Sequence, residues 1–104
     1  MADRLAERAG RAPDVVQDAS RATRAQRAFQ GMRDAAVGIE GSVDRARADL
    51  LALHHDPDAS PEDFRAALRA MRERNAPWFE ALLERRAEAA RATTAREWNE
   101  LVRD

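Results

Sequence analysis

The middle of the chain reads His54-His55-Asp56-Pro57-Asp58-Ala59-Ser60-Pro61-Glu62-Asp63, and this stretch decides the fold. Its prolines, aspartates and serine interrupt the hydrophobic pattern, so residues 56–61 predict a short turn. Ser60 followed by Pro61 and two acids is typical of a helix N-terminus, with the serine as cap and the proline in the first turn. The stretch therefore ends one helix and begins another.

Upstream of this turn, apolar or small residues recur at alternating spacings of three and four, which is the period of a helix. Pro13 followed by Asp14 is typical of a first helical turn, so we expect a first arm over residues 13–55, preceded by a separate N-terminal segment over residues 1–12. The seam of this arm consists of Ala22, Ala25, Phe29, Met32, Ala36, Ile39, Val43, Ala46, Leu50 and Leu53.

Downstream of the turn, a second seam with helical spacing predicts a second arm over residues 62–92. Thr94-Ala95-Arg96-Glu97 has the form of a capping box, which predicts a short terminal helix over residues 95–103. The second seam consists of Phe64, Leu68, Met71, Asn75, Trp78, Leu82, Ala89 and Ala92.

Two places predict departures from straight helices. Gly38 and Gly41 weaken the first arm, and Ser42 would cap a helix that restarts there, so we expect a bend near residues 38–42. Pro77 removes one backbone hydrogen bond from the second arm and crowds the preceding turn, so we expect a kink near this proline.

Two arms of similar length around one tight turn predict an all-α fold, an antiparallel helical hairpin with short terminal helices. The 104 residues form a single domain. Folding at the turn pairs residues whose numbers add to about 117, so that bulky side chains meet small ones. This register places Ile39 opposite Trp78, and Arg33 opposite Glu84.

A second apolar row on the second arm and the terminal helix is the candidate interaction surface. A hairpin buries one seam between its arms, so a second row needs another cover. That cover is the N-terminal segment with Leu5 and Ala9, a second copy of the chain, or a partner protein. We expect self-association into a helical-bundle dimer. The large residues of the row, and the predicted protein-interaction residues, are Phe79, Leu83, Trp98 and Leu101.

The composition offers no visible catalytic group, cofactor site or metal site. The chain has no cysteine, and its only histidines are His54 and His55, which lie in the turn without the spacing of helical metal sites. The four glycines are scattered rather than gathered in a phosphate-binding loop. We therefore predict a protein that is not an enzyme, with no cofactor and no bound metal.

Charge argues against nucleic acid as a partner. The chain carries 18 arginines, no lysine and 19 acids, for a net charge of −1. Arginines outnumber acids by seven to four before residue 34, but no aromatic stacking row accompanies them. No apolar run approaches the roughly 20 residues of a membrane span. The N-terminus as written has no export signal, so we expect a cytoplasmic protein unless a signal has been removed.

Residues about 43–104 resemble the C-terminal part of the Spy/CpxP-type periplasmic chaperone and metal-stress family. The shared elements are a helix over Val43–Leu53, a turn with Asp56-Pro57-Asp58, a long charged helix over Phe64–Ala92, and a motif that starts a final helix. In that motif, Thr93 and Glu97 replace the family's Leu and Gln. The resemblance implies a curved helical dimer that holds partly unfolded proteins on an apolar and basic surface, and it implies a periplasmic location. The histidine and methionine ligands of the metal-sensing members are missing.

A second resemblance concerns Phe29-Gln30-Gly31, which is similar to the aromatic-x-Gly element of small secreted helical hairpins of the WXG type. In that family the element lies in the turn, whereas here it lies inside the first seam.

The sequence thus predicts a non-enzymatic helical protein-interaction module. The favoured form is a chaperone-like stress protein that binds other proteins through an apolar and arginine-rich surface. The alternatives are a small stoichiometric inhibitor, immunity or adaptor protein, and a secreted WXG-type hairpin.

Overall fold

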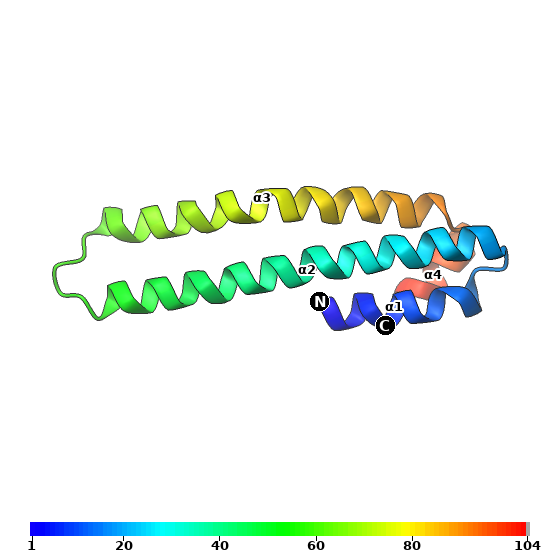
Figure 1. The fold of residues 1–104 in the computed structure, drawn as a ribbon, viewed down its shortest axis with the longest axis horizontal. Coiled ribbons are helices and arrows are strands. Elements are labelled where there is room, and N and C mark those ends of the chain that lie inside the picture. The colour runs from blue at the N-terminus through cyan, green and yellow to red at the C-terminus, as the bar shows by residue number, and fades with distance from the viewer. Residues whose placement is uncertain (104) are drawn as a thin grey trace.

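The helical periods of the sequence become four α-helices in the computed structural model, which describes residues 1–103 (Figure 1). These are α1 (Ala2–Val15), α2 (Ala19–His54), α3 (Pro61–Arg91) and α4 (Ala95–Val102). The two long helices, α2 and α3, lie antiparallel along a molecule that measures 60 × 19 × 17 Å. The predicted all-α hairpin with short terminal helices is confirmed, and the dimer remains a prediction.

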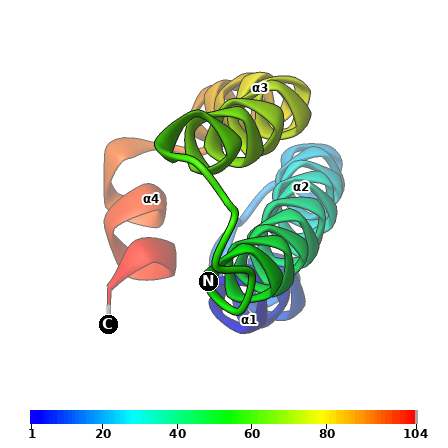
Figure 2. The ribbon, with the colours of Figure 1, turned by 90° about the vertical axis from the view of Figure 1, so that its left-hand side faces the viewer.

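The terminal helices fold back on one end of the hairpin. Figure 1 shows α1 along the first half of α2, and Figure 2 shows α4 on the opposite side from α2, between α3 and α1. At this end the molecule is therefore a four-helix arrangement. At the other end, near the turn, α2 and α3 lie without a third helix beside them.

The predicted serine cap at Ser60 and the predicted capping box at Thr94 are both confirmed, and the structure shows a full capping box at each place. The Ser60 hydroxyl accepts a hydrogen bond from the Asp63 amide, and the Asp63 carboxylate accepts one from the Ser60 amide. Thr94 and Glu97 form the same reciprocal pair at the start of α4. Each box satisfies backbone donors that have no partner inside the helix, and so fixes where the helix begins.

The prediction that Pro13 begins the first arm is wrong. Pro13 lies inside α1, and α2 begins only at Ala19, where the Asp18 side chain accepts from the Arg21 amide over 2.8 Å. A proline inside a helix leaves the carbonyl four residues earlier without its donor. Here the Gln26 side-chain amide donates to the Ala9 carbonyl over 3.2 Å. A neighbouring helix thus supplies the bond that Pro13 removes.

The predicted restart of the first arm at Ser42 is also wrong, because α2 continues from Ala19 to His54 through both glycines. A Cβ at Gly38 would come within 2.6 Å of the Trp78 ring, so this glycine admits a close contact between α2 and α3. The Ser42 hydroxyl accepts from Arg74 Nε over 3.2 Å instead of capping a helix. In the same way, α3 continues through Pro77.

The contacts between the long helices agree with the predicted register to within one residue. Trp78 lies against Gly38, Arg85 against Gly31, and Arg74 on Ser42, so the residue numbers of each pair add to 116. Trp78 therefore sits beside Ile39 rather than directly opposite it. Arg33, predicted to face Glu84, pairs with its neighbour Asp34 at 3.6 Å.

The core lies where all four helices meet. Alanines supply most of it, which lets the helices approach closely, and Phe29 and Leu101 are its largest fully buried side chains. Leu5 and Ala9 of α1 are buried here as well. The N-terminal segment, which was one of the three predicted covers, therefore covers part of the apolar surface.

Candidate functional site

Helix α4 defines one end of the candidate site. Its apolar face fills one end of a groove between α1 and α3. The Trp98 ring stacks on Phe29 with the ring centroids 6.0 Å apart. The Arg86 guanidinium of α3 covers the Trp98 ring at 5.1 Å from its centroid, which is a cation–π distance. Leu101, one turn further along, is fully buried.

Glu97 holds the N-terminal end of α4. Its carboxylate accepts from Arg21 Nη1 over 2.6 Å, from the Thr94 amide over 2.8 Å and from the Gln17 amide over 3.0 Å. Arg21 also donates to the carbonyl of Ala92, at the end of α3. The hydrogen bond from Arg21, followed by those from the two amides, lowers the pKa of Glu97 to about 2. The hydrogen bond to Glu97 in turn raises the pKa of the Arg21 guanidinium.

The Glu97 contacts predict a specific acid sensitivity. A carboxyl whose pKa is lower in the folded than in the unfolded chain stabilises the fold above its unfolded pKa, and the stabilisation is lost as pH falls through the folded value. We expect Glu97→Gln to destabilise the protein at pH 7, and expect the difference from wild type to shrink between about pH 5 and pH 2.

Urea unfolding of both proteins across this pH range measures that difference directly. Glu100→Gln is the control, because Glu100 forms an exposed ion pair with Arg103 and should show a small difference at every pH. If the difference in the free energy of unfolding between wild type and Glu97→Gln stays constant with pH, the charge of Glu97 does not stabilise the fold.

Arginines of α1 hold the other end of α4. Arg11 Nη2 donates to the carbonyls of Glu100 and Leu101 over 2.9 and 2.8 Å, and Arg8 Nη2 donates to the carbonyl of Val102 over 3.4 Å. The last carbonyls of a helix have no hydrogen-bond donor inside the helix, so a guanidinium group here satisfies them. Its positive charge also interacts favourably with the negative end of the helix dipole. Together with Arg21, these arginines of the N-terminal third thus hold α4 at both of its ends.

The groove continues past the C-terminal end of α4 as a half-open cavity of about 500 Å³. The residues that line it lie one helical turn away from the residues that contact α4. On α2, Met32 lies one turn after Phe29, and on α3, Leu82 lies one turn before Arg86. Leu5 and Arg4 continue the α1 wall from Arg8. The lining residues are Met1, Arg4, Leu5, Arg8, Met32 and Leu82.

Two large apolar side chains of α3 are exposed within one helical turn of Leu82, which lines this cavity. Phe79 and Leu83 flank Leu82 on α3, and 48 % of Phe79 and 60 % of Leu83 is accessible to solvent. Among the described residues, Arg4 and Arg8 supply the charge that lines the cavity. This surface, comprising the cavity and the exposed Phe79 and Leu83, is called the α1–α3 groove below.

The predicted interaction row is divided by the fold. Phe79 and Leu83 are on the surface, whereas Leu101 is buried and Trp98 is partly buried against Phe29. The predicted single surface of four residues is therefore not present in this chain, because α4 turns its apolar face inward. Sequence reasoning placed Met32 and Leu82 in the seams and missed the groove that they line, whose walls come from helices far apart in sequence.

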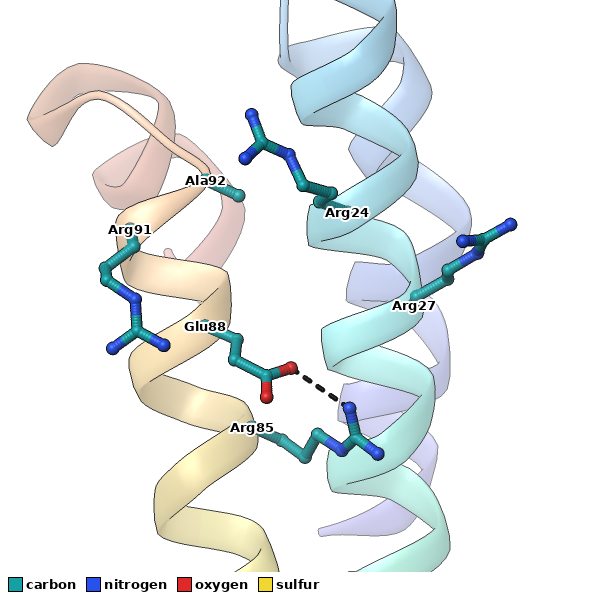
Figure 3. A pocket seen from close by; sticks show the side chains of 6 residues that line it. All are labelled: Arg24, Arg27, Arg85, Glu88, Arg91 and Ala92. Carbon is teal, nitrogen blue, oxygen red and sulfur yellow. Dashed lines mark hydrogen bonds and ion pairs between the residues drawn. The ribbon is translucent and has the colours of Figure 1, made fainter.

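A second cavity, of about 300 Å³, lies between α2 and α3 on another part of the surface (Figure 3). Arg24, Arg27, Arg85 and Arg91 line it with Glu88, and Arg85 pairs with Glu88 at 3.0 Å. Figure 3 shows the Arg24 guanidinium directed toward the end of α3, and that of Arg27 directed away from α3. The four cations do not converge on one point, so this cavity is the weaker candidate.

The histidines and the hydropathy add no further candidate. The His54 and His55 rings lie edge to face, 5.8 Å apart, at the end of α2. Within residues 1–103 no three side chains of the metal-binding types come together. No helix in the same range combines the length and the hydropathy needed to cross a bilayer.

The exposed apolar groove is thus the feature of the described chain that most needs an explanation. Comparisons with models of protein families, with curated proteins and with solved structures found no match to this chain. The resemblances noted in the sequence therefore remain predictions, and the function has to be argued from the groove itself.

Proposed function

We propose that this protein is a non-enzymatic helical interaction module that binds another protein through the α1–α3 groove. The observation that carries the proposal is the exposure of Phe79 and Leu83 within one helical turn of Leu82, which lines a largely apolar cavity. Exposed apolar patches rimmed by polar groups are typical of protein-binding surfaces. Fully burying an exposed side chain of this size contributes about 1.5–3 kcal/mol, and Phe79 and Leu83, which are about half exposed, would each contribute roughly half of that.

The form of this activity that the sequence resemblance favours is a chaperone-like stress protein. Such a protein binds segments of partly unfolded clients, and the groove offers apolar side chains beside arginines for that purpose. A small stoichiometric inhibitor, immunity or adaptor protein uses the same kind of surface on one folded partner. A secreted WXG-type hairpin is the third form.

Self-association is a second candidate function, favoured by a different part of the molecule. Near the turn, α2 and α3 have no third helix beside them, and Leu51 and Leu68 are exposed there. Two such hairpin ends packed together would complete a four-helix bundle, which is a common way for helical hairpins to bury apolar faces.

The two candidates predict different effects of surface substitutions. We expect Phe79→Ser with Leu83→Glu to abolish binding of partner or client proteins while leaving helix content unchanged, since both side chains are already exposed. The measurement is capture of crosslinked proteins in the native host, together with suppression of aggregation of a heat-denatured reporter protein. Leu51→Glu is the matched control, because it removes an equally exposed apolar side chain at the far end.

Light scattering separates the outcomes. Wild type that is monomeric at high concentration and loses capture only in the groove variant supports binding of another protein. A dimer that Leu51→Glu dissociates supports self-association instead. Equal capture by wild type and the groove variant would contradict the proposed function.

A further inference from the structure

The two ends of the hairpin differ in how much apolar surface they bury. The buried core cluster lies where the four helices meet and contains no residue of the stretch 43–72, which is called the distal hairpin below. Within that stretch, all of which the structure describes, Ala46 is the one buried apolar residue. The large side chains of its seam, among them Leu50, Phe64 and Met71, are only partly buried, and no third helix lies beside them (Figure 1). A segment with few buried apolar contacts opens at a lower free energy than the core.

The ion pairs of the distal hairpin do not join its two arms. Arg47 pairs with Asp44 inside α2, and Glu62 pairs with Arg65 and Arg69 inside α3. Pairs of this kind support a single helix and do not hold one helix against another. The two arms are therefore held together there mainly by partly buried apolar side chains.

Both long helices are weakened in the layer where the distal hairpin meets the four-helix end. This layer, called the middle layer below, consists of residues 38–42 of α2 and 73–78 of α3. The α2 segment contains two glycines, which have low helix propensity. The α3 segment contains Pro77, which has no amide to donate to the Glu73 carbonyl. Among the described residues no side chain donates to this carbonyl, in contrast to the one that Pro13 leaves free.

The middle layer also holds a buried polar atom without a partner. Asn75 is only 6 % exposed, and its Oδ1 has no hydrogen-bond donor within residues 1–103. A buried acceptor without a donor lacks the hydrogen bonds that water would give it. The orphaned oxygen therefore favours any state in which water enters this layer.

The support that α1 gives to the hairpin ends at the middle layer. The Ala2 amide, at the start of α1, donates to Glu40 Oε1 over 3.2 Å. Across the same layer, Arg74 donates from Nε to the Ser42 hydroxyl over 3.2 Å and from Nη2 to the Ser42 carbonyl over 3.3 Å. Separating the arms beyond this layer has to break these two hydrogen bonds of Arg74.

From these observations we propose that the distal hairpin opens and recloses as one unit while the four-helix end stays folded, with the middle layer as its hinge. In the open form the Arg74 contact with Ser42 is broken and the Asn75 oxygen is hydrated. Isolated helices shorter than about 12–15 residues are marginal in water, so the amides of both separated arms lose protection together.

Opening gives the molecule an apolar surface that the closed form hides. Leu50, Phe64 and Met71 face the opposite arm in the closed hairpin and reach solvent when the arms part. The distal hairpin is thus a gate over its own seam. This inference is independent of the proposed function, because the α1–α3 groove lies at the other end of the molecule and is tested by capture of proteins.

Hydrogen exchange of the full wild-type chain measures the opening directly. The exchange is followed amide by amide by NMR spectroscopy in increasing, non-denaturing concentrations of urea. Relative to their intrinsic rates, we expect the distal amides to exchange at least about tenfold faster than those of the α2 core around Phe29. We also expect both distal arms to share one dependence on urea, because a cooperative opening exposes one common surface.

A methionine on each side of the hinge provides a matched pair of substitutions. Met32 belongs to the core cluster, so Met32→Ala weakens the four-helix end equally in the closed and open forms. We expect the core amides to exchange about tenfold faster or more, and the distal amides to change by less than about twofold. Met71→Ala removes a contact that only the closed form has, so the distal amides of both arms should exchange several-fold faster.

Asn75→Leu tests the role of the middle layer. It removes the orphaned oxygen that favours the open form, so we expect the exchange of the distal amides to slow by about tenfold. Asn99→Leu is the control, because Asn99 lies on the exposed surface of α4 and should leave the distal exchange unchanged.

Three results would overturn the inference. If Met32→Ala accelerates the core and distal amides equally, the hairpin unfolds in one step with the core. If the distal amides of wild type are as well protected as the core, or if the two arms differ in their dependence on urea, no distal unit opens. If Asn75→Leu leaves the distal exchange unchanged, the middle layer is not the hinge. Circular dichroism checks the fold of each variant, and the wild-type comparison decides the question without them.

Discussion

Phe29→Ala is expected to destabilise the protein by about 3–5 kcal/mol, the usual loss when a fully buried phenylalanine is truncated. Phe29 has no exposed surface and stacks on Trp98, so its removal leaves a cavity beneath α4. The surrounding core residues are mainly alanines of helices fixed by caps, and these side chains are too short to fill the space. Since small domains are stable by about 5–15 kcal/mol, this change removes a large share of the total.

Urea unfolding gives the change in the free energy of unfolding, and Phe79→Ala is the matched control. The control makes the same substitution on a side chain that is half exposed, so we expect a cost below about 1 kcal/mol. A similar loss in the free energy of unfolding for the two variants would show that Phe29 does not support the packing of α4. A larger cost for Phe29→Ala supports the arrangement in which Phe29 joins α4 to the hairpin.

The long helices could be predicted from local signals. Ser60 with Asp63 and Thr94 with Glu97 are capping boxes that act over three residues, and the structure confirms both. The antiparallel register followed from the position of the turn, since two straight helices leave little freedom once their connection is fixed. These features depend on residues close together in the chain.

The position of α4 could not be predicted in this way. Its helix was evident from Thr94 and Glu97, but its contacts with Arg8 and Arg11 join residues about 90 positions apart in sequence. From its helical period alone, the sequence predicts Trp98 and Leu101 on an outer surface with Phe79 and Leu83. The groove was missed for the same reason, because its three walls belong to α1, α2 and α3.

Pro13 shows how a local signal can be overruled by a distant side chain. A proline followed by an acid favours a helix start, and a helix that continues through it loses a hydrogen bond. Gln26 supplies a donor to the Ala9 carbonyl from the next helix, which makes the interior position acceptable. Neither residue identity nor period reveals this contact in advance.

Two glycines of α2, Gly38 and Gly41, predict opposite effects of an alanine substitution, although their local sequence signal is the same. A Cβ at Gly38 would lie 2.6 Å from the Trp78 ring, whereas nothing lies within 4 Å of one at Gly41. Alanine is more favourable than glycine in a helix by about 1 kcal/mol, so Gly41→Ala should raise the free energy of unfolding by about that amount. Gly38→Ala forces Trp78 to move, at a cost of about 1–3 kcal/mol that cancels or exceeds the same gain.

A double-mutant cycle with Trp78→Ala isolates the cause of this difference. Without the indole ring, the methyl group at position 38 meets no obstacle from Trp78, so Gly38→Ala should become stabilising, as Gly41→Ala is in both backgrounds. Denaturant unfolding of the single and double variants supplies the coupling energy between positions 38 and 78. If Gly38→Ala stabilises the wild-type background as much as Gly41→Ala, the indole ring is not packed on α2. Gly38 would then be a weak point of the helix, as its low helix propensity predicts, and not the position that admits the Trp78 ring against α2.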